Sequence, residues 1–180
     1  MLRIDVDETY SLRSYRRDDK QHLVTYANNE KVARNLRDGF PHPYTNETAD
    51  QWLDTAIDHL SDSVFVIAED DLLIGGIGYH PQEDVYRFSA EIGYWLGEPY
   101  WGRGIVTRCV GKLVDWIFTE TEMTRLYAGV YANNPASVRV LEKNGFRLEG
   151  RLRQAVVKGG VVLDELRYAL LREEWLKEAR

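Results

Sequence analysis

A short glycine-rich turn near the middle of the chain has the residue types needed to bind an anion. The turn, residues 101–104 (WGRG), follows an apolar run that ends at Leu96, and an apolar pattern with helical spacing begins at Ile105. The pattern predicts a strand, a tight turn and then a helix. The first N–H groups of a helix have no partner inside it, and the helix dipole makes that end positive. We therefore expect this turn to hold phosphate oxygens.

A carboxylate on the strand that enters the turn could act as a general base. Side chains alternate along a strand, so Glu91 shares a face with Gly93 and Trp95. Next to an apolar run the carboxylate would be partly desolvated, which raises its pKa toward a value useful for proton transfer. The alternative is a structural salt bridge to an arginine such as Arg87 or Arg139.

The turn alone does not specify its ligand. A P-loop would carry a lysine followed by Ser or Thr, and the chain has neither there. A dinucleotide-binding turn would have a third glycine where Thr107 stands, three residues after Gly104. A second segment, residues 133–146 (NNPASVRVLEKNGF), makes the pattern more specific.

Together these segments resemble the GNAT superfamily of N-acetyltransferases, and within it the ribosomal-protein alanine N-acetyltransferases. The resemblance extends from about Ser11 to Trp175 and is carried by residues 90–95 (AEIGYW), the WGRG turn, residues 134–146 and the closing Asp164, Tyr168, Glu174 and Trp175. It implies acetyl-CoA as co-substrate, with the pyrophosphate held by backbone amides of the turn. Two positions depart from the family pattern: Trp101 replaces Gln or Arg, and Val106 replaces a small residue.

The resemblance also implies site residues. Acetyl transfer to an amine needs a base, donors to the oxyanion and an acid for the leaving thiolate. Glu91 is the expected base and Ser137 the expected acid, although Ser137 could equally be a helix-capping residue. A tyrosine acid common in the superfamily is missing, because Leu141 occupies its position. The expected co-substrate-binding residues are Trp95, Leu96, Trp101, Gly102, Arg103, Gly104, Ile105, Val106, Thr107, Asn134 and Ser137.

Some residues have more specific expectations. Asn134 is expected both to cap a helix before Pro135 and to hold the pantetheine arm. A backbone N–H at Trp95 or Leu96 is the expected oxyanion donor, provided that the following strand splays away. Arg103 and Arg108 could reach phosphates or could simply be solvated.

Composition excludes several other classes of protein. A chain of 180 residues with 44% hydrophobic residues predicts one globular domain over residues 1–180. The net charge of −6 argues against nucleic acid as the main partner and suits an amine acceptor. There is no transmembrane run and no apolar leader, so we expect a cytoplasmic protein. The single cysteine, Cys109, is expected to be a buried helix residue, and no metal site is expected.

The order of elements predicts an α+β domain of the GNAT type, with a mixed, mostly antiparallel seven-stranded sheet and helices on both faces. We expect strands over residues 10–16, 64–68, 72–79, 88–96, 125–131, 146–157 and 161–171. We expect helices over residues 18–28 and 30–36, after the cap Thr45, and over residues 104–120, 134–144 and 173–179. Between Asp38 and Tyr44, prolines exclude regular structure.

Single residues mark several boundaries of these elements. Asp18 is the expected N-cap of the first helix. The glycines inside residues 72–79 indicate a bulge or the close approach of another backbone. Gly145 is expected to end the helix over residues 134–144, and Gly159 and Gly160 predict a tight hairpin turn.

The resulting functional expectation is an acetyl-CoA-dependent N-acetyltransferase, expected to be a homodimer, that acts by direct attack of a primary amine. The acceptor is either a protein N-terminal α-amine or a small-molecule amine. The alternative is a non-catalytic acyl-CoA-binding sensor module, which loss of the tyrosine acid would fit.

Overall fold

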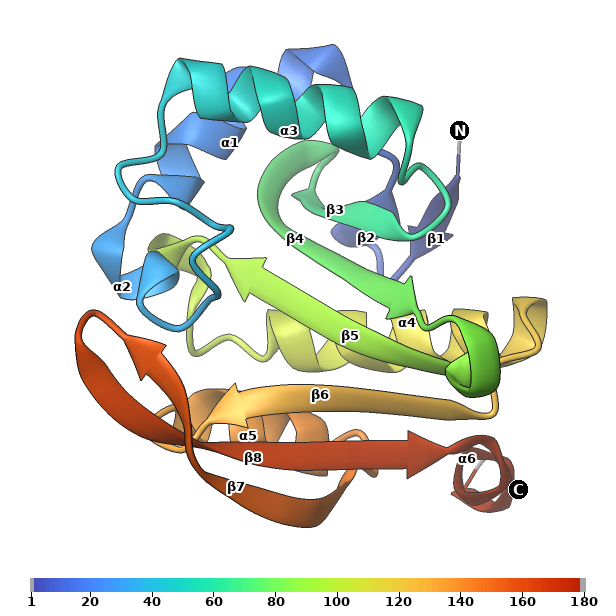
Figure 1. Cartoon of the computed structure of the whole chain (residues 1–180). Helices are drawn as coiled ribbons and strands as arrows, with labels where there is room; N and C mark the ends of the chain where they lie inside the picture. Colours follow the sequence, from blue (N-terminus) through green and yellow to red (C-terminus); the bar gives the residue numbers. More distant parts are fainter. Residues whose placement is uncertain (1, 179–180) are drawn as a thin grey trace. The chain divides into compact units, whose positions relative to one another are not determined.

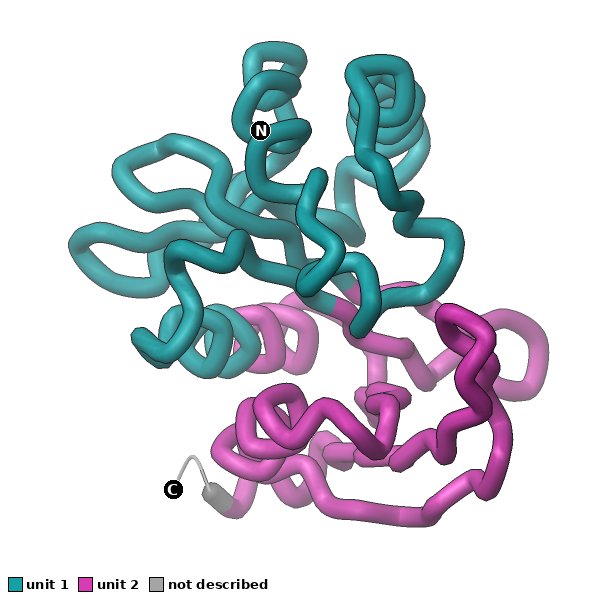
Figure 2. The backbone as a smooth tube through the Cα atoms, turned by 90° about the vertical axis from the view of Figure 1, so that its left-hand side faces the viewer, with its two compact units in different colours: residues 1–78, 94–112 teal, residues 79–93, 113–180 magenta. Residues whose placement is uncertain are grey.

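The computed structural model describes residues 2–178, which fall into two compact units (Figure 2). Unit 1 comprises the residues up to 78 together with residues 94–112, and unit 2 comprises residues 79–93 together with the residues from 113 onward. Strand β4 (Leu72–Pro81), strand β5 (Ser89–Leu96) and helix α4 (Ile105–Glu120) each continue from one unit into the other. The single domain expected over residues 1–180 stays a prediction, and the two units are described separately.

Unit 1 combines antiparallel strands with helices α1, α2 and α3 and the first part of α4, all labelled in Figure 1. Its strand order is β1-β2-β3-β4-β5, and the pairings of β1 with β2, β2 with β3 and β3 with β4 are antiparallel. Besides β4 and β5, its elements are β1 (Arg3–Asp5), β2 (Tyr10–Arg13), a 3-10 turn (Arg17–Asp19), α1 (Lys20–Ala27), α2 (Glu30–Ala33), α3 (Asn46–Asp58), β3 (Val64–Glu69) and a second 3-10 turn (Glu98–Tyr100).

The hairpin of β3 and β4 contains the bulge that its glycines predicted. The register shifts between Ile67 and Ala68, so one strand carries an extra residue at that point. The predicted close approach of another backbone is also present, because a Cβ at Gly75 would lie 2.5 Å from the Trp95 carbonyl oxygen. The glycine therefore lets the end of β5 lie against β4.

Two helix caps were predicted in unit 1, and the structure confirms one of them. Thr45 Oγ1 accepts a 3.2 Å hydrogen bond from the Thr48 N–H, which confirms the expected cap of α3. Asp18, in contrast, does not cap α1: the capping position belongs to Asp19, whose side chain makes no capping bond there. The Asp19 carboxylate instead binds the buried Arg13. Strand β2 also ends at Arg13, earlier than the predicted Arg16.

Unit 2 contains the parallel part of the sheet. Its strand order is β5-β6-β8-β7, in which β5 and β6 are parallel and the other two pairings are antiparallel. Helix α4 connects the parallel pair, as expected for a crossover. The further elements are a 3-10 turn (Asp84–Tyr86), β6 (Arg125–Tyr131), α5 (Pro135–Glu142), β7 (Arg147–Lys158), β8 (Val161–Leu171) and α6 (Arg172–Glu178).

Glycine positions in unit 2 confirm two predicted turns. Gly145 has φ +78°, its N–H donates to the Glu142 carbonyl, and the Phe146 N–H donates to the Leu141 carbonyl. This pair of bonds is the Schellman arrangement that ends a helix. Gly159 and Gly160 have φ +57° and +77°, which fits the tight two-residue turn between β7 and β8.

The described residues contain eight strands rather than the seven predicted. The additional strand is β1, a three-residue segment too short to give a periodic signal, which is held by its antiparallel pairing with β2. The predicted last helix is present as α6, and Ala179 lies outside the described residues. Within residues 2–178, no helix is both long enough and apolar enough to span a bilayer.

Candidate active site

The glycine turn has an open backbone at the start of α4. Gly102 and Gly104 have φ +77° and +70°, in the left-handed region, and both are exposed. A Cβ at Gly102 would meet nothing within 4 Å. The Arg108 N–H donates to the Gly104 carbonyl over 3.2 Å, so the amides of Ile105 and Val106 precede this bond in the first helical turn. The turn can therefore be reached by a ligand and is suited to phosphate oxygens, which fits the pyrophosphate of acetyl-CoA.

Trp101, which departs from the family pattern, has a structural contact that fixes the turn. Its indole Nε1 donates a 2.7 Å hydrogen bond to the Leu96 carbonyl oxygen at the end of β5. Leu96 is buried, whereas 41% of Trp101 is exposed. The side chain thus closes the loop between β5 and the turn and still offers one face of its ring to solvent.

The two arginines expected near the phosphates are exposed and also bind protein groups. Arg103 Nη2 donates to the Pro99 carbonyl over 2.9 Å, and Arg108 Nε donates to Asp7 Oδ2 over 3.0 Å. Arg108 Nη1 also donates to the Arg103 carbonyl over 3.3 Å, so its positive charge lies at the turn. The two arginines favour an anion there through their charge.

Helices α1 and α2 hold the loop that precedes the turn. The hydroxyl groups of Tyr26 and Tyr100 are 2.9 Å apart, and Asn29 Nδ2 donates to Glu98 Oε2 over 2.8 Å. Lys31 binds the other Glu98 oxygen, and this bond, followed by that from Asn29, lowers the pKa of Glu98 below its usual value. A pocket of about 280 Å³ at this junction is lined by Thr25, Tyr26, Asn29, Glu98 and Pro99.

Glu91 lies in unit 2, on the first half of β5. It is half-buried, and its neighbours Ala90 and Ile92 are 0% and 3% exposed, so the predicted alternation holds around it. The parallel ladder pairs Glu91 directly with Tyr127 of β6. Among the described residues of unit 2, the ladder ends at this pair, since Gly93 and Ile92 have no register partner on β6. The two strands thus separate just after Glu91, in agreement with the expected splay.

Several residues on the same face as Glu91 were not anticipated from the sequence. Tyr127 shares this face because paired residues of neighbouring strands point to the same side. The Arg167 guanidinium lies 5.0 Å from the Tyr127 ring centroid and donates to Glu165 Oε1 over 2.6 Å. Glu165 and Arg167 are two residues apart on one strand, so the sequence alone indicates that they share a face of the sheet. Only the strand register shows that Glu91 lies on the same face.

Asn134 and Ser137 are at the start of α5. Asn134 Oδ1 accepts a 3.3 Å hydrogen bond from the Ser137 N–H, which confirms the predicted cap before Pro135. Both side chains are half-buried. The cap uses the oxygen of Asn134, and the roles of the Asn134 amide NH₂ and the Ser137 hydroxyl toward a co-substrate stay predictions. Leu141, where the superfamily tyrosine would stand, is completely buried and belongs to the core.

Cys109 is confirmed as a buried helix residue. It is 0% exposed, and burial raises the pKa of its thiol to about 12. A thiol that is almost entirely protonated at neutral pH is a poor nucleophile, so a covalent acyl-cysteine step is disfavoured. Residues 2–178 contain no group of three or more His, Cys, Asp or Glu side chains arranged to hold a metal ion.

Comparison with known proteins agrees with this geometry. The family profile described as "Acetyltransferase (GNAT) domain" matches residues 10–147. The chain is 37% identical over 106 residues to the putative ribosomal N-acetyltransferase YdaF of Bacillus subtilis (strain 168), covering 59% of this chain and 57% of that protein. It therefore aligns with little more than half of YdaF.

Two further similarities extend over nearly the whole chain. The chain is 27% identical over 169 residues to spermidine N(1)-acetyltransferase of Escherichia coli (strain K12), covering 93% of this chain and 88% of that protein. The solved structure of RimL, a ribosomal L7/L12 alpha-N-protein acetyltransferase in complex with coenzyme A, superposes with a TM-score of 0.85 at 24% identity, covering 94% and 98% of the two chains. The profile match, which covers most of the sequence, and this shared fold lead to one conclusion: the chain belongs to the GNAT family of acetyltransferases.

Proposed function

We propose that the protein is an acetyl-CoA-dependent N-acetyltransferase that transfers an acetyl group to a primary amine by direct attack. The observation that carries the proposal is the open, left-handed glycine turn at the start of α4, joined by the single strand β5 to the carboxylate of Glu91. The turn supplies an anion site, and Glu91 supplies a base. Acetyl-CoA would supply an acetyl group already activated as a thioester.

The turn and α5 are the proposed contacts with acetyl-CoA. Backbone amides over residues 102–107, with Arg103 beside them, would hold the pyrophosphate. Trp101 would contribute the exposed face of its ring. Asn134, whose amide NH₂ is not used by the cap, would hold the pantetheine arm.

Glu91 is the proposed base. A lysine-like amine has a pKa of about 10.4 and an N-terminal amine one of about 8, so the acceptor arrives mostly protonated. The half-buried Glu91 carboxylate would take that proton, directly or through water, and so generate the nucleophile. A backbone N–H late in β5, at Trp95 or Leu96, would donate to the developing oxyanion. The Ser137 hydroxyl would donate a proton to the departing thiolate.

Two acceptor classes are compatible with the comparisons. YdaF is named as a ribosomal N-acetyltransferase, and the Escherichia coli relative is named for spermidine. A protein N-terminal α-amine and a small-molecule amine therefore both remain within the proposal.

We also propose that the protein is a homodimer that associates through the β7–β8 hairpin. Five apolar side chains of this hairpin are 40–63% exposed, which is unusual for large hydrophobic residues: Leu148, Leu152, Val157, Val161 and Val162. Light scattering coupled to gel filtration should give twice the mass of one chain, and Val157→Asp should give a monomer.

Turnover on an amine panel tests the proposed activity. The protein is incubated with acetyl-CoA and peptides, amino acids, polyamines or amino sugars, and free thiol release is followed. Amine-dependent thiol release, with the acetylated amine identified by mass spectrometry, is the expected result. Binding of coenzyme A without turnover on any amine would contradict the proposal and would favour a non-catalytic sensor.

A further inference from the structure

Two arginines lie over the same tyrosine ring in unit 2, but they differ in how their hydrogen-bond donors are used. Arg125 and Arg167 lie 5.9 Å and 5.0 Å from the Tyr127 ring centroid. Both Nη groups of Arg125 bind the two carboxylate oxygens of Glu149, a bidentate pair that uses the end of the guanidinium fork. Arg167 Nη2 donates to Glu165 Oε1 over 2.6 Å, and the Arg167 Nε is buried without a hydrogen-bond partner in the described part of the chain.

Glu165 holds Arg167 in this position. A Cβ at Gly129 would lie 2.7 Å from the Glu165 carboxyl carbon, so the carboxylate fills the space that the glycine leaves on β6. The Glu165 side chain is only 14% exposed, and Arg167 is paired with Gly129 in the strand register. A buried carboxylate that is packed against backbone and bonded to an arginine restricts that arginine to few rotamers.

The guanidinium of Arg167 lies over the ring of the residue that pairs with the proposed base. Tyr127 is the direct register partner of Glu91, and neighbouring strands are about 4.8 Å apart. Arg167 lies over that tyrosine ring, on the face of the sheet that Glu91 shares. In an α-amino-acyl acceptor the carbonyl group is only one carbon away from the amine, so a cationic donor on the face of Glu91 can select for that carbonyl. A third of the Arg167 side chain is exposed and can be reached by a ligand.

We propose that Arg167 is the specificity-determining residue of the acceptor site and donates to the carbonyl or carboxylate oxygen of an α-amino-acyl acceptor. This inference rests on the proposed function, in which Glu91 receives the proton of the acceptor amine. The acceptor is accordingly a peptide N-terminus or a free amino acid rather than a polyamine. A second ammonium group of a polyamine would meet the positive charge of Arg167, and such like-charge contact selects against the wrong partner. Glu165 is a positioning residue that acts through Arg167.

Paired acceptors that differ only in the carbonyl test the proposal. The wild-type protein, Arg167→Met and the milder Arg167→Lys are assayed with a short peptide amide, a free amino acid, a plain monoamine of similar size and a diamine. Arg167→Met should raise the KM for the peptide amide or the amino acid at least tenfold, about 1.4 kcal/mol. The KM values for acetyl-CoA and for the monoamine should stay within twofold, and Arg167→Lys should have a smaller effect.

The matched control is Arg125→Met, which removes the other arginine from the Tyr127 ring. It should leave the ratio of the KM for the peptide amide to the KM for the monoamine unchanged. Glu165→Gln should raise the peptide KM by a smaller factor while kcat is kept, which a general loss of structure would not do. Comparison of the peptide amide with the free amino acid identifies which of the two sources is bound.

Three results would overturn the proposal. The first is an unchanged ratio of the peptide KM to the monoamine KM in Arg167→Met. The second is an equal change of that ratio in Arg125→Met. The third is a preference of the wild-type protein for the diamine over the peptide amide and the amino acid. In each of these cases the acetyltransferase activity itself stands. Absence of wild-type turnover on every amine would overturn the proposed function as well, and so the two failures are distinguishable.

Discussion

The indole Nε1 of Trp101 donates a 2.7 Å hydrogen bond to the carbonyl oxygen of Leu96. This bond joins the first residue of the glycine turn to the last residue of β5 and spans the 3-10 turn between them. A side chain therefore fixes how the turn leaves the strand. The family pattern has a Gln or Arg at this position. In this chain the indole N–H of Trp101 instead stabilises the loop between β5 and the turn.

Trp101→Phe should weaken coenzyme A binding while the protein remains folded. Removing one hydrogen bond to a backbone carbonyl costs about 0.5–1.5 kcal/mol of unfolding free energy, and the loosened turn should raise the Kd for coenzyme A several-fold. Trp175→Phe is the control, because it removes an indole bond of 2.8 Å to Asp115 far along the chain from the turn. Equal Kd values for the two variants in calorimetric titration would show that the bond does not shape the turn.

Gly102→Ala should destabilise the protein through backbone conformation alone. The position has φ +77° and open space around a built Cβ, so the expected cost is conformational strain of about 1–2 kcal/mol rather than a clash. Gly39→Ala is the matched control, since Gly39 also has open space and no positive φ. The unfolding free energy measured by urea denaturation should be lower than that of the wild type in Gly102→Ala only. Similar unfolding free energies for the two variants would refute the strain argument.

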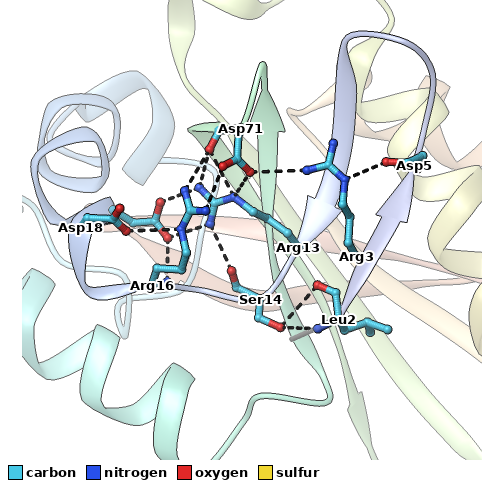
Figure 3. A network of polar contacts seen from close by, with 9 residues as sticks. Leu2, Arg3, Asp5, Arg13, Ser14, Arg16, Asp18 and Asp71 are labelled. Carbon is cyan, nitrogen blue, oxygen red and sulfur yellow. Dashed lines mark hydrogen bonds and ion pairs between the residues drawn. The ribbon is translucent and has the colours of Figure 1, made fainter.

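Arg13 and Asp19 form a buried ion pair that anchors the start of α1 to β2. Both side chains are 3% exposed, and the Nη groups of Arg13 lie 2.9 Å and 2.6 Å from the Asp19 oxygens. Figure 3 shows Arg13 in the surrounding polar network, beside Arg16 and Asp71. Arg13→Met leaves a buried carboxylate without its cation, which should cost about 3–5 kcal/mol in unfolding free energy. Arg3→Met breaks an exposed pair with Asp5 and should cost less than about 1 kcal/mol. A loss below 1 kcal/mol for Arg13→Met would mean that the buried pair contributes little.

Asp71 should make the stability of the fold sensitive to acid. A hydrogen bond from Arg16 lowers the pKa of Asp71 below its usual 3.8. The unfolded chain then binds a proton more readily than the folded one. The stabilisation from Asp71 is therefore complete above pH 3.8 and is lost as the pH falls through the lowered pKa of the folded state.

Asp71→Asn should accordingly reduce the slope of stability against pH between about pH 5 and about pH 3. Urea midpoints measured at about pH 5 and about pH 3 should converge in the variant more than in the wild-type protein. Half of the Asp71 side chain is exposed, so solvent screening keeps the effect small. The exposed carboxylate Asp62 supplies the control variant Asp62→Asn, which should retain the wild-type slope. An unchanged slope in Asp71→Asn would assign the acid sensitivity to other groups.

Features of the fold that depend on neighbouring residues in the chain could be predicted from the sequence. Asn134 before Pro135 predicted the start of α5, and Gly145 predicted its end. Gly159 and Gly160 predicted the turn of the last hairpin. In each case the physical cause, a capping bond or a left-handed backbone, lies within a few residues, so the local pattern was sufficient.

Features that depend on distant pairings could not be predicted. The sequence predicted Asp18 as the cap of α1, and only the folded position of Arg13 shows that Asp19 stands at the helix start and forms an ion pair. The short strand β1 exists because it pairs with β2. The candidate site shows the same division: Glu91 could be identified from its strand, but Tyr127 faces it only through the strand register.

The assignment of Glu91 as the base is tested most directly by Glu91→Gln, measured for both turnover and coenzyme A affinity. The substitution keeps the shape of the side chain and removes its capacity to accept a proton. Loss of a general base lowers kcat/KM for the amine by about 10²–10⁴-fold, and the Kd for coenzyme A should stay within about twofold of the wild-type value. Glu149→Gln, a change to another carboxylate of unit 2, should keep nearly full activity. Wild-type turnover in Glu91→Gln, with coenzyme A binding intact, would contradict this mechanism.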